Sequence, residues 1–152
     1  MRATRAVLLG TALGLSWAGS GILAADAPAG FRLVVSPNSN VTKLDRAEVA
    51  RIFLRKQSRW RNGGDAVPVD QSARSPVRAA FSKEVLAVEG LGKISAVEGY
   101  WRQLIFTGRG TPPPVKDGDA EVLRYVASTP GAIGYVSESA ELSGVKPVTL
   151  EN

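Results

Sequence analysis

The chain has 152 residues, a formal net charge of +5, and neither cysteine nor histidine. The absence of these two residue types excludes disulfides, Cys-His and Ser-His-Asp nucleophilic sites, and metal sites built from His and Cys. The net positive charge favours an anionic ligand or surface as the binding partner. The lack of interleaved basic and aromatic residues argues against nucleic acid as that partner.

The N-terminus has the order of features that is typical of a secretory signal peptide. Arg2 and Arg5 give a positive start, and an apolar run over residues 6–18 is followed by small residues. This run is shorter than the roughly 20 residues that span a bilayer, so we expect no stable membrane insertion. We expect residues 1–25 to be removed, which leaves one domain over residues 26–152 in the periplasm.

Three elements are predicted at the start of this domain. Residues 31–36 are apolar and stop at Pro37, as in a buried strand. Residues 44–55 form a predicted helix that is capped by Asp45. Residues 66–70 form a predicted short strand, with its proline at the strand start or at a sheet edge.

The next predicted helix begins at Ser75, its cap, and Pro76, its first residue. An apolar stripe follows at helical spacing: Val77, Phe81, Val85 and Val88. Ser95 and Glu98 are interpreted as the capping box of a further helix. Its predicted apolar face comprises Val97, Trp101, Leu104 and Ile105, which makes Trp101 a core residue.

A last helix is predicted over residues 119–128, with strands over residues 132–136 and 145–150. Helices therefore alternate with strands along the chain. This alternation predicts the α/β class.

One candidate anion site surrounds the start of the helix that begins at Ser75. The free N–H groups and the dipole of a helix N-terminus attract an anion. Ser72 and Ser75 would add hydroxyl groups, and Arg74 or Arg78 would add a guanidinium that can bind an oxyanion with two hydrogen bonds. Arg74 precedes the cap and is the better placed of the two cations.

A second candidate is the loop over residues 107–110. Thr107, Arg109 and the backbone amides of two glycines could wrap an oxyanion, although the loop lacks the Gly-Lys-Ser/Thr of a nucleotide P-loop. The same residues also suit a helix stop with Gly108 in the left-handed conformation, which is the favoured interpretation.

A run of cations without an acidic residue among them covers the end of the first predicted helix and the residues after it: Arg51, Arg55, Lys56, Arg59 and Arg61. A solvated face explains this run most simply. A docking patch for an acidic partner or a membrane surface is the alternative.

Three segments together resemble a known family. Residues 51–60, 67–78 and 129–136 are similar, in order and spacing, to the periplasmic phosphate-binding proteins of ABC transporters. This resemblance implies a type II periplasmic binding protein-like fold, reduced here to a small single unit with a mixed sheet and flanking helices. It also implies inorganic phosphate or another small oxyanion as ligand.

The sequence departs from that family at the ligand loop. Where the family has an arginine, a serine, a glycine and a threonine, this chain has Gln71, Ser75, Pro76 and Val77, so only Ser75 carries over. The family's Gly-Lys after the first helix is Arg55-Lys56 here. The fold therefore transfers from the resemblance more fully than the ligand site does.

We therefore expect an oxyanion-binding protein without cofactor, metal or enzymatic activity. The residues expected to contact the ligand are Ser72, Arg74, Ser75, Arg78, Thr107 and Arg109. An ABC transporter membrane component or another periplasmic protein is the expected macromolecular partner. The alternative is an interaction module that kept the fold and lost the ligand site.

Overall fold

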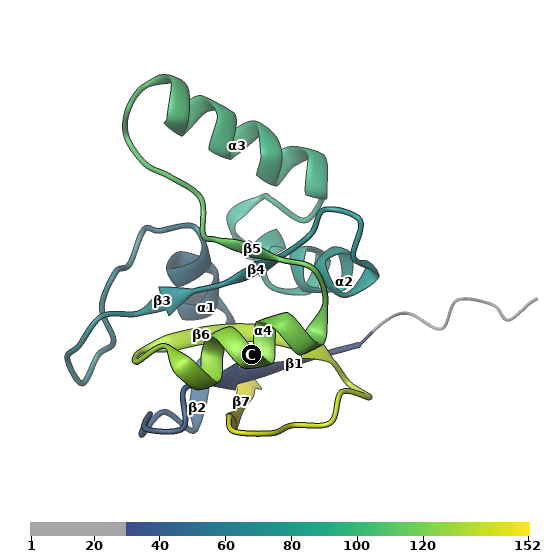
Figure 1. Cartoon of the computed structure of the whole chain (residues 1–152). Coiled ribbons are helices and arrows are strands. Elements are labelled where there is room, and N and C mark those ends of the chain that lie inside the picture. The colour runs from purple at the N-terminus through teal and green to yellow at the C-terminus, as the bar shows by residue number, and fades with distance from the viewer. Residues whose placement is uncertain (1–29) are drawn as a thin grey trace, which may run out of the picture.

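The computed structural model describes residues 30–152, so the predicted signal peptide lies outside the described residues. A five-stranded mixed sheet with strand order β2-β7-β1-β6-β3 forms the centre of the fold (Figure 1). Its strands are β1 (Phe31–Val35), β2 (Lys43–Asp45), β3 (Val67–Pro68), β6 (Ala132–Ser137) and β7 (Lys146–Glu151). β1 runs antiparallel to β6 and β7, whereas β2 and β3 pair in parallel with β7 and β6. A separate parallel pair consists of β4 (Asp70–Gln71) and β5 (Val115–Lys116).

Four α-helices and one 3-10 helix flank the strands in the described part of the chain. They are α1 (Arg46–Phe53), α2 (Pro76–Glu84), η1 (Leu86–Glu89), α3 (Ile94–Phe106) and α4 (Asp119–Ser128). None of the helices within residues 30–152 is long and apolar enough to cross a membrane. The α/β class, with a mixed sheet and flanking helices, is confirmed.

Alternate residues of the central strands supply two separate cores, as the period of two in a strand requires. Leu33 of β1 and Tyr135 of β6 belong to the larger core, which α1, α2 and α3 cover. Val34 and Val136 belong to the smaller core, where α4 packs on the other face of the sheet. β6 is therefore buried on both faces.

Several local predictions are confirmed. The Asp45 carboxylate accepts the N–H of Glu48 at 2.6 Å and caps α1. The Ser75 hydroxyl accepts the N–H of Arg78 at 3.3 Å and caps α2, with Pro76 as the first helical residue. Trp101 is buried in the larger core, as predicted. Arg55 adopts a left-handed φ of 58°, at the position where the resembled family has glycine.

Other predictions are wrong. The single strand predicted over residues 66–70 is divided between β3, at the edge of the large sheet, and β4 in the small one. The predicted Ser95–Glu98 capping box does not form, because α3 begins at Ile94 without a side-chain cap. Val88 and Ile105, which were predicted to be core residues, are 51% and 55% exposed. Val88 lies in η1, where the chain has left the helical period of α2.

Candidate functional site

The predicted anion site lies at the turn between β4 and α2. The N–H of Ser75 donates to the carbonyl of Ser72 at 2.9 Å and closes this turn. Ser72, Arg74, Ser75 and Arg78 are thus brought together within one short segment. Pro76, as the first residue of α2, has a fixed φ and no N–H to offer.

Gln71 occupies the inner side of this turn and is buried. Its side-chain carbonyl accepts the hydroxyl of Ser75 at 2.7 Å. Its amide nitrogen donates to the carbonyl of Tyr135 at 2.9 Å and to the carboxylate of Asp119, the first residue of α4, at 3.1 Å. A neutral amide therefore links the starts of α2 and α4, and the Ser75 hydroxyl is already used within the protein.

Arg78 faces inward and forms a buried ion pair with Asp70. The two side chains are 8% and 10% exposed, and Nη2 of Arg78 lies 3.2 Å from Oδ2 of Asp70. Nη1 of Arg78 also donates to the carbonyl of Gln71 at 3.0 Å. The guanidinium is thus neutralised and satisfied inside the fold, so the charge of Arg78 does not add to an open anion site.

Asp70 accepts two further hydrogen bonds, from the N–H of Gln71 at 2.8 Å and from the hydroxyl of Tyr135. Burial raises the pKa of the Asp70 carboxyl, and the charge of Arg78 and these two donors act in the opposite direction. Burial, and then the neighbouring Asp70 charge, raise the pKa of Tyr135. The phenol therefore stays protonated over the ordinary pH range and remains a donor to Asp70.

The remaining donors of the turn are exposed or unpaired. The Arg74 side chain is exposed, and its guanidinium has no hydrogen-bond partner within residues 30–152. The N–H groups of Ala73 and Val77 also have no partner among the residues that the structure describes. Ser72 accepts the N–H of Arg74 at 3.4 Å, and its own O–H is free to donate. The groups left to bind a ligand at this turn are one exposed guanidinium, one hydroxyl and two backbone amides.

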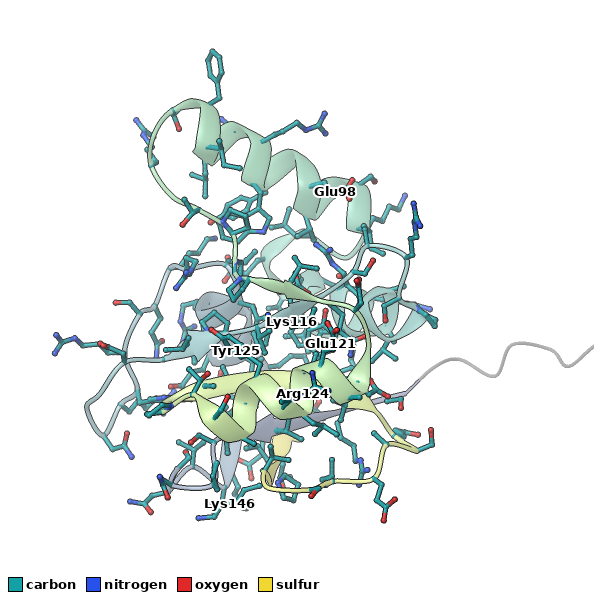
Figure 2. The ribbon with its side chains drawn as sticks, in the orientation of Figure 1. Glu98, Lys116, Glu121, Arg124, Tyr125 and Lys146 are labelled. Carbon is teal, nitrogen blue, oxygen red and sulfur yellow. The ribbon has the colours of Figure 1, made fainter. Side chains whose placement is uncertain are left out.

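Strand pairing brings one other cation close to the turn, because Lys116 of β5 pairs with Gln71 of β4. Its ammonium group lies 5.3 Å from the ring centroid of Tyr125 on α4 (Figure 2). This cation–π contact holds the charge of Lys116 against α4. Arg74 is therefore the predicted site residue whose charge is open to solvent at the turn.

The loop over residues 107–110 is confirmed as a helix stop. Gly108 has a φ of 66°, and the N–H of Arg109 donates to the carbonyl of Leu104 at 2.9 Å. The hydroxyl of Thr107 donates to the carbonyls of Gln103 at 2.9 Å and Leu104 at 3.3 Å. These donors satisfy the last carbonyls of α3. Thr107 and Arg109 are placed at the end of α3 and do not belong to the turn before α2.

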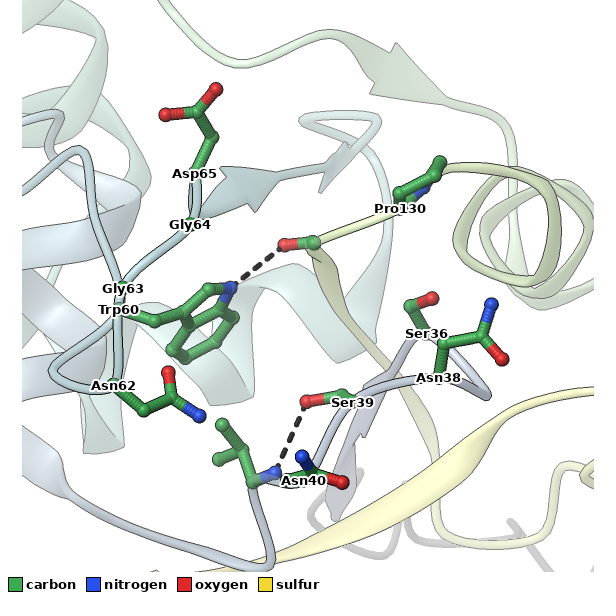
Figure 3. A pocket seen from close by; sticks show the side chains of 12 residues that line it. Ser36, Asn38, Ser39, Asn40, Trp60, Asn62, Gly63, Gly64, Asp65 and Pro130 are labelled. Carbon is green, nitrogen blue, oxygen red and sulfur yellow. Dashed lines mark hydrogen bonds between the residues drawn. The ribbon is translucent and has the colours of Figure 1, made fainter.

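An open groove of about 380 Å³ lies at the other end of β6, next to Gly131 (Figure 3). No lysine or arginine lines it, and Asp65 adds a carboxylate. The indole N–H of Trp60 donates to the carbonyl of Gly131 at 3.2 Å and forms one wall. Gly131 has a φ of 76°, and a Cβ atom there would lie 2.1 Å from the Asp65 carbonyl oxygen. The groove lacks the cations that an oxyanion site needs.

Sequence reasoning missed the buried partners of the turn. Asp70 is the last residue of the strand predicted over residues 66–70, but its partners Arg78 and Tyr135 lie 8 and 65 residues further along the chain. Gln71 was visible only as a departure from the resembled family. The available signal for a polar site was the change from the apolar residues 66–69 to the polar Asp70 and Gln71.

No family model and no curated protein sequence matches the chain. Solved structures do match. One is described as a phosphate ABC transporter substrate-binding protein with bound phosphate from Clostridium perfringens, with a TM-score of 0.61, 24% identity, and coverage of 80% of this chain and 45% of that one. Others are an ABC-type phosphate transport receptor from Vibrio cholerae (TM-score 0.59, 18% identity, 82% and 47% covered) and PstS from Borrelia burgdorferi (0.58, 16%, 82% and 48%).

These similarities define the class of fold. The chain has a solute-binding-protein-like fold of the type that phosphate-binding proteins have, which confirms the expected fold class. The chain spans slightly less than half the length of these structures. By their descriptions, the first two of these structures are a substrate-binding protein and a transport receptor.

Proposed function

We propose that this chain is a periplasmic solute-binding-like protein that binds phosphate or a similar small oxyanion at the turn before α2. The observation that carries the proposal is the exposed Arg74 beside two unpaired N–H groups, that of Ala73 in the turn and that of Val77 in the first turn of α2. The guanidinium supplies charge and two parallel donors, and the helix end supplies amides and a favourable dipole. The fold shared with phosphate-binding proteins supports the same ligand class.

Binding at this turn is expected to be weak. Ser75 and Arg78 donate within the protein, so a bound anion would have fewer donors than a buried dianion needs to offset its lost hydration. We expect a dissociation constant of about 1 mM, which corresponds to roughly 4 kcal/mol. A partner, such as a membrane component of an ABC transporter, would complete the site and strengthen binding.

Calorimetric titration of phosphate and sulfate into the purified protein tests the proposal. Arg74→Ala should weaken binding by about 10- to 150-fold, because a hydrogen bond to a charged group contributes about 1.5–3 kcal/mol. Arg74→Lys should recover only part of this loss, since an ammonium group cannot form two parallel hydrogen bonds. Arg102→Ala, at an exposed arginine of α3, is the matched control and should bind as the wild type does.

The result also separates the two hypotheses that the sequence left open. Equal affinity of the wild type and Arg74→Ala would move the site away from this turn, with Thr107 and Arg109 next to be tested. Absence of heat at millimolar phosphate and sulfate would contradict oxyanion binding and support the interaction module.

A further inference from the structure

The inner side of α3 anchors this helix to the rest of the protein. Val97 and Trp101 are buried in the larger core, with Leu104 packed against it. The hydroxyl of Tyr100 donates to the carbonyl of Leu54, at the end of α1, at 2.9 Å. α3 is therefore attached to the rest of the fold along its inner side, and its other side chains face outward.

The last two residues of α3 are large, apolar and exposed. Phe106 is 92% exposed and Ile105 is 55% exposed. Single exposed apolar side chains are common on protein surfaces, but two adjacent large ones at a helix end form a local apolar tip. We refer to Ile105 and Phe106 as the α3 tip. The folded chain gains almost nothing from burying Phe106, so a structural role does not explain this residue.

The segment around the α3 tip is basic. From Gly99 to Lys116 there is no acidic residue, and Arg102 and Arg109 are both exposed. Arg102 lies one helical turn before Phe106, and Arg109 follows three residues after it. Glu98, the acidic residue of α3, lies one helical turn before Arg102 and two turns before Phe106 (Figure 2). From Gly99 onward the helix and the loop after it therefore carry cations beside the apolar side chains and no acidic residue.

The shape of this region favours one kind of partner. α3 lies at the outside of the fold, and the chain after it loops back to β5 (Figure 1). A stable protein–protein interface buries about 800 Å² on each partner, which two side chains do not supply. A symmetric contact with a second copy would bring arginines of the two copies together. A bilayer needs no complementary shape, and anionic headgroups match the arginines.

We propose that the α3 tip is a peripheral docking surface for an anionic lipid bilayer. The Phe106 ring and the Ile105 side chain enter the boundary between headgroups and acyl chains, while Arg102 and Arg109 contact lipid phosphates. This inference is independent of oxyanion binding at the turn before α2, because none of its residues lies in that turn.

Cosedimentation with vesicles tests this proposal. The wild type should bind vesicles of phosphatidylglycerol mixed with phosphatidylcholine, should not bind phosphatidylcholine alone, and should be released by high salt. Phe106→Ser should reduce vesicle affinity by about tenfold or more, because it removes a large apolar side chain from the bilayer. Val88→Ser, at an apolar residue of η1 that is 51% exposed, is the matched control and should have no effect.

The contribution of the two arginines to vesicle binding is tested with separate variants. Arg102→Gln and Arg109→Gln should each lower vesicle affinity about fivefold, since each cation near an anionic surface contributes about 1 kcal/mol. Arg124→Gln, at an exposed arginine of α4, should bind as the wild type does (Figure 2). All these positions are exposed, so thermal unfolding should be unchanged and a loss of binding cannot be attributed to misfolding.

Three results would overturn the proposal. The wild type could fail to bind phosphatidylglycerol vesicles, or Phe106→Ser and Val88→Ser could bind them equally well. Sedimentation equilibrium could also show a dimer that Phe106→Ser dissociates, which would make a second copy of the chain the occupant of the tip.

Discussion

The buried pair of Arg78 and Asp70 allows a quantitative test of how the candidate turn is built. Asp70→Asn keeps an oxygen that can accept the Tyr135 hydroxyl but removes the charge that faces Arg78. With both side chains about nine-tenths buried, the variant leaves a guanidinium without its counter-charge. Removing one partner of a buried pair costs about 3–5 kcal/mol. We expect Asp70→Asn to lower the free energy of unfolding by this amount.

A double-mutant cycle isolates the interaction itself. Arg78→Met removes the other charge while keeping an apolar chain of similar length, and the double variant removes both. The double variant should lose less stability than the sum of the single variants, with a coupling of about 1–3 kcal/mol. Urea unfolding followed by circular dichroism at neutral pH measures all four proteins. Additive losses would refute the reasoning and would return Arg78 to the residues that can bind a ligand.

Three further predictions follow from other contacts. Trp101→Ala should destabilise the protein by about 3–5 kcal/mol by leaving a cavity in the larger core, and a loss below about 1 kcal/mol in urea unfolding would contradict its burial. Arg55→Gly should stabilise the protein by up to about 1 kcal/mol, because it relieves a left-handed φ of 58° in a residue with a side chain; a lower melting temperature would argue against this. The pKa of Tyr135 is higher in the folded protein than in the unfolded chain, where the ordinary value of 10.0 holds. As the pH rises above 10.0, the unfolded chain therefore loses the phenol proton while the folded protein keeps it, and the stability that this group contributes below pH 10.0 is lost. Alkaline unfolding of Tyr135→Phe should therefore show a pH slope that is shallower by about 1.4 kcal/mol per pH unit, and an unchanged slope would mean that Tyr135 is not shielded.

The features of the fold that depend only on residues close together in the sequence were predictable from it. Asp45 and Ser75 were identified as caps because a cap bonds to an N–H only three residues further on. The strands β1 and β6 were identified because they are short, apolar and bounded by proline or glycine. These signals do not depend on which elements meet in space.

The inner half of the candidate site could not be predicted in the same way. The hydrogen bond from Gln71 to Asp119 joins residues 48 positions apart, and that between Tyr135 and Asp70 joins residues 65 apart. Such contacts are set by the strand order, which a single sequence does not specify. The sequence therefore indicated the donors around the turn but not that Ser75 and Arg78 are used internally.

The spacing of apolar residues gave wrong core predictions at two places: where a helix ended, and where no other part of the described chain packs against the helix. Val88 continues the stripe of Val77, Phe81 and Val85 in sequence, but α2 ends at Glu84 and the change to a 3-10 turn rotates Val88 outward. Ile105 follows the apolar pattern of α3, but nothing in the described chain packs against the helix end at this position. An apolar pattern predicts which face can be buried, and only the tertiary structure decides whether it is.

The central claim, that a small oxyanion binds at the turn before α2, is tested most directly by a phosphate titration followed in ¹H–¹⁵N correlation spectra. The amide signals of Ala73, Arg74 and Val77 should shift most and saturate together, and Arg74→Ala should greatly weaken these shifts. Absence of shifts at this turn at millimolar phosphate, or a main response at residues 107–110, would contradict it.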